Sequence, residues 1–208
     1  MTTQITEKVR TKNRASLLLI FVLFAAPVVL AWLLFFVFPD WTPKSTSNHG
    51  TLVEPVRQLP AFQLPTLKGE PVSEAFLQGK WTFVYVHRGA CESDCVQQLY
   101  TMRQVRLTQG KHIDRLQRLM LWDAAGVEAA HRNELQQHFP GQMTAILAGE
   151  SAPLLAAAFE VDGQAPLTGE NLFLVDPLGN LMMVYAPGGE PRGMIKDLER
   201  LLKYSALR

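Results

Sequence analysis

Cys91 and Cys95 are the only two cysteines in this chain of 208 residues, and three residues separate them. A strand-like run over residues 81–86 leads into this pair, and a helix-like run follows it. Sulfur atoms at the start of a helix face unpaired N–H groups and the positive end of the helix dipole, which favour the thiolate. Two such thiolates can bind one soft metal ion or close into a disulfide. The sequence therefore predicts redox or metal chemistry at Cys91 and Cys95.

A purely structural disulfide is the alternative interpretation of this pair. Closing so short a loop removes little entropy from the unfolded chain, so such a bridge adds little stability. In a reactive pair, we expect Cys91 to lie at an exposed turn and to attack, and Cys95 to resolve the mixed disulfide from within the helix. Glu92 and Asp94 oppose a thiolate beside them, whereas Arg88 and the helix N-terminus favour it. The local charge leaves the balance between these effects open.

An uncharged apolar run over residues 16–38 predicts how the domain is attached. A helix of this length crosses a bilayer core of about 30 Å, and Pro27 is tolerable within it. A cleaved signal peptide would have a shorter apolar core and a small-residue cleavage site. Residues 1–15 carry four basic residues against one acidic residue, which places them in the cytoplasm by the positive-inside rule. We expect a single-pass helix over 16–38 in the cell inner membrane, a tether over 39–58 and a periplasmic domain over 59–208.

The charge of the exported part gives no support to nucleic acid as a partner. Beyond residue 15 the chain carries 16 basic and 18 acidic residues. Five basic residues between Arg103 and Arg118 can form a local patch, but a solvated helix face and strand edge also explain them.

Strand and helix patterns alternate through the exported part. We expect strands over residues 59–65, 81–87, 116–122, 143–147, 171–175 and 181–185, and helices over residues 94–109, 127–138, 151–159 and 191–203. The segment 176–180, Asp-Pro-Leu-Gly-Asn, is a strong hairpin signal. This order predicts an α/β domain, soluble and monomeric, with a central mixed sheet flanked by helices. A cysteine pair at the first strand-to-helix turn makes the expected fold thioredoxin-like.

Several motifs resemble the Sco/SenC family of membrane-anchored, thioredoxin-like proteins that help to assemble the copper sites of cytochrome c oxidase. The motifs are Phe62-x-Leu64, Gly69-x-x-Val72, Gly79-Lys80-Trp81, Cys91-x-x-x-Cys95 and the segment Leu172–Gly179. The resemblance covers residues 59–203, and the single N-terminal anchor also matches. It implies Cu(I) at Cys91 and Cys95. It also implies the oxidase subunit that carries the copper site as a partner, together with other thiol- or copper-handling proteins.

Two departures from the family pattern bear on the metal site. The family has proline after each cysteine, where this chain has Glu92 and Val96. The family also completes its copper site with a histidine about eight residues before the Pro-x-Gly turn, and this chain has no histidine after His138. The metal site implied by the resemblance therefore lacks its third ligand.

His87, at the end of the strand that leads to Cys91, is the best-placed substitute. Strand geometry allows it to point to either face, and a polar strand-end residue that binds nothing is the alternative. Glu170 offers a hard carboxylate, which suits Cu(I) poorly. We expect the remaining side chains of interest in the tether, in more distant helical segments or in the core: His49, His112, His131, His138, Met102, Met182 and Met183.

Three hypotheses of function follow. The first is a thiol–disulfide oxidoreductase that reduces the cysteines of the oxidase copper site through Cys91 and Cys95, because a dithiol needs no third ligand for this exchange. The second is a metallochaperone that delivers Cu(I) to the oxidase. The third is a non-catalytic, membrane-tethered assembly factor for which both cysteines are dispensable.

Overall fold

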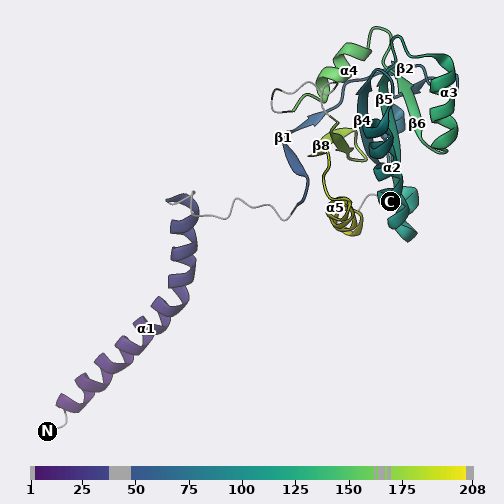
Figure 1. Cartoon of the computed structure of the whole chain (residues 1–208). Helices are drawn as coiled ribbons and strands as arrows, with labels where there is room; N and C mark the ends of the chain where they lie inside the picture. The colour runs from purple at the N-terminus through teal and green to yellow at the C-terminus, as the bar shows by residue number, and fades with distance from the viewer. Residues whose placement is uncertain (1–2, 38–47, 162, 164–166, 168–169, 205–208) are drawn as a thin grey trace. The chain divides into compact units, whose positions relative to one another are not determined.

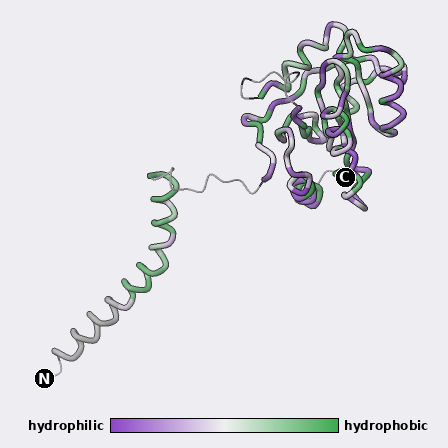
Figure 2. Tube along the Cα trace, viewed as in Figure 1, coloured by the Kyte–Doolittle hydropathy of each residue, from purple (hydrophilic) through white to green (hydrophobic). Residues whose placement is uncertain are grey.

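The computed structural model describes residues 3–37, 48–161, 163, 167 and 170–204, in two units, Met1–Ser47 and Asn48–Arg208. The first unit contains α1 (Thr3–Phe36), within which Ser16–Phe36 is long and apolar enough to cross a membrane. Figure 2 shows this apolar stretch in green. The described part of the chain therefore contains one helix suited to membrane anchoring, as predicted. Residue 38 of the predicted span and residues 39–47 of the predicted tether lie outside the described residues.

The second unit is built on a six-stranded mixed sheet in the order β1-β8-β7-β4-β5-β6 (Figure 1). β4 (Trp81–Arg88), β5 (Leu116–Asp123) and β6 (Met143–Ile146) pair in parallel. β7 (Leu172–Val175), β8 (Asn180–Tyr185) and β1 (Thr51–Gln58) add antiparallel strands on the other side of β4. A separate hairpin joins β2 (Gln63–Leu64) and β3 (Val72–Ser73), and the short helix η2 (Glu74–Leu77) follows. This confirms the predicted thioredoxin-like mixed sheet.

Helices cover both faces of the sheet because β4 is apolar on both sides. One face packs against α2 (Ser93–Thr108), α3 (Ala129–His138) and α5 (Pro191–Tyr204). The other face packs against α4 (Ala152–Ala158) and the β2–β3 hairpin. Leu99, Met102 and Val105 recur at helical spacing on the buried side of α2, as the sequence pattern predicts. Each such side chain contributes about 1.5–3 kcal/mol by leaving water. The short helix η3 (Gly110–Arg115) lies between α2 and β5.

The prediction that residues 51–58 belong to a tether is wrong, because they form β1 and pair with β8. One proline and two charged residues interrupt this segment, and its register shifts between Leu52 and Arg57. Such a strand is tolerated at a sheet edge, where one side needs no ladder hydrogen bonds. The pattern of the segment alone therefore does not separate it from a linker.

A buried carboxylate ties the start of this unit to its last helix. Asp197 of α5 accepts hydrogen bonds from the backbone N–H of His49, at 2.9 Å to Oδ2, and of Gly50, at 2.9 Å. Tyr185 donates its hydroxyl to the same carboxylate at 3.4 Å. His49, predicted in the tether, is thus held against the domain.

Candidate redox and metal site

The loop between β4 and α2 is held in place by β5. Gly89 has a φ of 83°, which favours glycine, and its N–H donates to the carbonyl of Asp123 at 2.9 Å. The indole N–H of Trp122 donates to the carbonyl of Gly89 at 2.8 Å. Because both bonds engage the residue at which the loop leaves the strand, the following cysteine is presented from a fixed turn.

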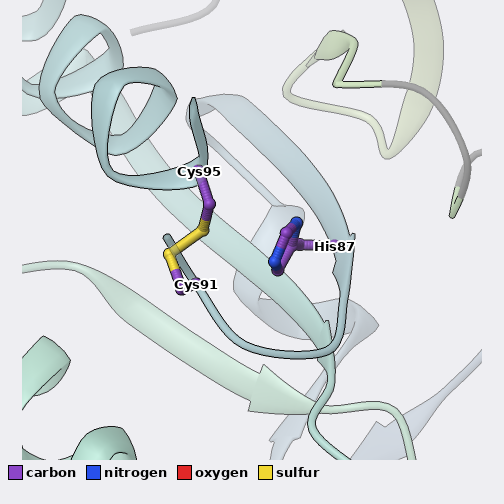
Figure 3. A group of neighbouring side chains, drawn as sticks. All are labelled: His87, Cys91 and Cys95. Atoms are coloured by element: carbon purple, nitrogen blue, oxygen red, sulfur yellow. A yellow bond between two sulfur atoms is a disulfide. The ribbon is translucent and has the colours of Figure 1, made fainter. Parts of the chain in front are cut away.

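The loop and the first turn of α2 are joined by a disulfide between Cys91 and Cys95, whose Cα atoms lie 5.1 Å apart (Figure 3). Each cysteine is only 2% exposed. The expectation that Cys91 lies at an exposed turn is therefore wrong: Gly89 and Ala90 of the turn are accessible, but the Cys91 side chain belongs to the buried core cluster that also contains Leu99 and Trp122. Once the disulfide is reduced, Cys95 lies in the first helical turn, where unpaired N–H groups favour its thiolate.

His87 points to the same side of the sheet as the disulfide (Figure 3). One ligand atom from each of His87, Cys91 and Cys95 lies within 4.8 Å of the other two. The side-chain period of two places His87 on the face of Tyr85 and Phe83, which packs against α2. The structure thus brings together the three residues that the sequence analysis selected and decides the face that the sequence left open.

The hydrogen bonds of His87 define its tautomer. Its Nε2 lies 3.1 Å from the carbonyl oxygen of Ala90, which can only accept, so Nε2 carries the proton. Its Nδ1 therefore accepts the hydroxyl proton of Tyr85, at 3.2 Å. A metal bound at Nε2 would displace this proton to Nδ1, and the Tyr85 oxygen would then accept it. The phenol can serve both tautomers, as supporting groups of ligand histidines do.

Tyr85 is the functional side chain that the sequence analysis missed. It is fully buried, and its ring stacks on that of His87 with centroids 5.6 Å apart. Burial raises the pKa of Tyr85 well above its ordinary value, and the charges of Glu170 and Asp94 raise it further. The hydroxyl therefore stays protonated. Its position two residues before His87 on one strand was the available signal.

The charged residues nearest the disulfide in sequence are either paired with an opposite charge or exposed to water. The Arg88 guanidinium donates to the Asp123 carboxylate at 2.9 Å, so its charge is partly compensated across β4 and β5. Glu92 and Asp94 are exposed at the start of α2, where water screens them. The helix N-terminus therefore remains as the main feature that favours a thiolate.

A pocket of about 360 Å³ lies between α2 and α3 and reaches Cys91. His131 and His138 line this pocket, although the sequence analysis placed them in distant segments. A helix that follows β5 returns over the same face of the sheet, so residues some 40 positions apart meet there. The other side chains considered lie as follows: Met102 and Met183 in the core, Met182 partly buried against it, His112 partly buried in η3 and Glu170 partly buried before β7.

The donor set fits a soft metal ion. Two thiolates and one imidazole are ligands that Cu(I) prefers, and the three donors are already close together. In the disulfide form the sulfur atoms are bonded to each other, so two electrons must first reduce them before either binds a metal.

Comparison with known proteins places the chain in a family. Residues 81–205 match the family model described as a transmembrane-like, thioredoxin-like, C-terminal domain, and the chain belongs to this family. No curated protein matches the sequence.

Solved structures with the same fold include Sco proteins. Yeast Sco1 with copper bound has a TM-score of 0.60 and 16% identity, over 72% of this chain and 94% of that chain. BsSco, a member of the Sco family of cytochrome c oxidase assembly proteins with a disulfide switch, has a TM-score of 0.56 and 14% identity, over 73% and 96%. The thioredoxin domain of a thiol-disulfide oxidoreductase from Bacteroides vulgatus has a TM-score of 0.52 and 15% identity, over 70% and 95%. The Sco/SenC resemblance of the motifs is thus confirmed at the level of the fold.

Proposed function

We propose that this protein is a membrane-anchored assembly factor for the copper site of cytochrome c oxidase, and that it reduces the cysteines of that site through Cys91 and Cys95. The observation that carries the proposal is the disulfide between a fixed loop and the first turn of α2. Sco proteins and a thiol-disulfide oxidoreductase share its fold, which supports the context.

The proposed reaction moves two electrons from the protein to its client. The Cys91 thiolate attacks one sulfur of a client disulfide, and the other client sulfur leaves as a thiolate. The Cys95 thiolate then attacks Cys91 Sγ, and the first client cysteine leaves as a thiolate. Cys91 is assigned the attacking role because it lines the pocket between α2 and α3, which Cys95 does not. A thiol reductant must restore the dithiol after each cycle.

Delivery of Cu(I) is the second candidate, and the position of His87 favours it. With the disulfide reduced, Cys91, Cys95 and His87 would hold the ion as cargo and pass it on by ligand exchange. His87 would replace, from β4, the histidine that the sequence lacks before the Pro-x-Gly turn.

We further propose that the N-terminus is cytoplasmic and that the domain is periplasmic, anchored in the cell inner membrane. The basic residues before the apolar stretch support this orientation. A reporter that is active only in the cytoplasm, fused after residue 208, should then be silent, and strong activity would reverse the orientation.

The test compares the full-length protein with a Cys91→Ser/Cys95→Ser variant and a His87→Ala variant. Each is assayed for reduction of a disulfide in a purified oxidase copper-site subunit and for anaerobic Cu(I) binding against a competing chelator. The redox function predicts a reduction potential of about −120 to −270 mV and full activity in His87→Ala. A potential below about −300 mV would contradict it. Tight Cu(I) binding that His87→Ala abolishes would establish copper delivery instead. Normal oxidase assembly with the double serine variant would leave only a non-catalytic role.

A further inference from the structure

The pocket between α2 and α3 reaches the disulfide, and its lining combines one of the two cysteines with apolar and charged side chains. Cys91 forms one part of its wall, and Cys95 does not line it. Val96, Tyr100, Leu135 and Phe139 supply an apolar surface. Because both cysteines are almost fully buried and Cys91 lines this pocket, a reacting sulfur reaches Cys91 Sγ through the pocket.

The apolar surface continues out of the pocket onto α2. Tyr100 is 49% exposed and Val96 is 39% exposed, and they lie four residues apart on one helix face. Exposed apolar side chains that extend from a reactive group are typical of a surface that a partner covers. The volume of about 360 Å³ is at the lower end of the range for ligand pockets, which suits a narrow segment of chain.

The far end of the pocket is basic. Arg103 lines it, and among the described residues no hydrogen bond or ion pair engages the Arg103 guanidinium. Arg103 and Arg106 both lie close enough to Arg118 for their charges to act on it: burial of Arg118, together with these two charges, lowers its pKa to about 10. Glu134 is the single acidic side chain of the lining. The Nε2 atom of His131 is buried without a hydrogen-bond partner, which leaves a second polar group for a ligand.

The spacing along α2 sets the length of an occupant. Arg103 lies seven positions after Val96, the residue next to the disulfide, and this spacing corresponds to about 10 Å along a helix axis. An extended peptide covers about 3.3 Å per residue, so about three residues span this distance.

We propose that this pocket binds an extended segment of the client polypeptide, with the client cysteine at Cys91, an apolar side chain against Tyr100 and a carboxylate at Arg103. This inference rests on the proposed thiol exchange and adds the features of the client that are recognised. An acidic residue about three positions from the client cysteine is the expected signature.

The test uses the reduced full-length protein in detergent and short peptides whose cysteine carries thionitrobenzoate as a mixed disulfide. Cys91 attacks the peptide sulfur, and the coloured thionitrobenzoate leaves as a thiolate. Cys95 then displaces the peptide thiolate, so the protein ends as the disulfide. The peptides are Cys-Ala-Leu-Glu and its reverse, with matched peptides in which leucine is replaced by alanine or glutamate by glutamine. The mixed disulfide of cysteine alone measures intrinsic reactivity.

We expect the peptide with glutamate to react roughly fivefold faster than the one with glutamine in one chain direction. We expect the peptide with leucine to react roughly tenfold faster than the peptide with alanine at the same position. Arg103→Gln should remove the preference for glutamate over glutamine, and Tyr100→Ala should weaken the preference for leucine over alanine, each measured as a ratio of rates within the same variant.

Two control variants separate the pocket from general surface effects. Leu107→Ala removes a side chain of α2 that is as exposed as Tyr100, at 49%, but lies outside the pocket lining. Arg192→Gln removes an exposed charge on α5. Equal rates for all peptides, or equal effects of the pocket and control variants, would overturn the inference. A protein that fails to react even with the cysteine reagent would instead refute the proposed function.

Discussion

A Tyr85→Phe variant keeps the aromatic ring in the core and removes only the hydroxyl that hydrogen-bonds His87 Nδ1 at 3.2 Å. In the disulfide form, loss of the hydroxyl leaves Nδ1 of the half-buried His87 imidazole without its hydrogen-bond donor. We expect the free energy of unfolding to fall by about 1 kcal/mol. Because Cys91 and Cys95 make no bond to this hydroxyl, the rate of thiol exchange should stay within about twofold of the wild type.

Copper binding should respond more strongly to the same change. If Cu(I) binds at His87 Nε2, the proton moves to Nδ1 and needs the Tyr85 oxygen as its acceptor. Loss of such a supporting group lowers metal affinity by about 10- to 100-fold. We would measure this by anaerobic titration of the reduced full-length protein with Cu(I) against a competing chelator.

Tyr185→Phe is the matched control for Tyr85→Phe. Tyr185 is also buried, but its hydroxyl donates to Asp197, away from the cysteines. The Tyr185→Phe variant should lower the free energy of unfolding slightly and leave the copper affinity unchanged. Unchanged copper affinity in Tyr85→Phe would refute the supporting role of the hydroxyl, and unchanged affinity in His87→Ala would remove His87 from the site altogether.

Three further predictions concern the framework of the domain. Asp197→Ala leaves the backbone N–H groups of residues 49–50 without their acceptor, so denaturant unfolding should show a loss of about 3 kcal/mol, whereas Glu199→Ala on the exposed side of α5 should show almost none. Gly89→Ala adds a Cβ that meets no atom within 4 Å, so its cost is the strained φ of 83° alone, about 1–2 kcal/mol by the same measurement; a neutral result would contradict this. Arg118→Met should raise the free energy of unfolding by about 1–3 kcal/mol, because two guanidinium nitrogens of this 4% exposed cation lack partners. Since the pKa of Arg118 is lowered from its ordinary value to about 10, the charged form opposes folding below pH 10, and the advantage of methionine should shrink as pH rises above 10.

The sequence by itself determined the order of the main strands and helices from β4 onward and the residues that could react. The segments of β4 and β5 are apolar runs of strand length, α2 has apolar residues at helical spacing, and the hairpin between β7 and β8 has strong turn residues at 176–180. Cys91 and Cys95 were identified from type and spacing alone, because four positions are close along any chain. Local signals suffice when the interacting residues are neighbours in sequence.

Only the tertiary structure decided which distant groups surround the disulfide. The face to which His87 points follows from the packing of β4 between two layers, and the bond from Tyr85 follows from that face. Strand β1 exists because β8 offers it a ladder and Asp197 holds its start, neither of which lies near it in sequence. The presence of Cys91 and His131 in the lining of one pocket depends on α3 lying on the same face of the sheet as α2. Such contacts join residues that are far apart in sequence. The local pattern of residues does not predict them, because they form only when the long intervening segments fold back.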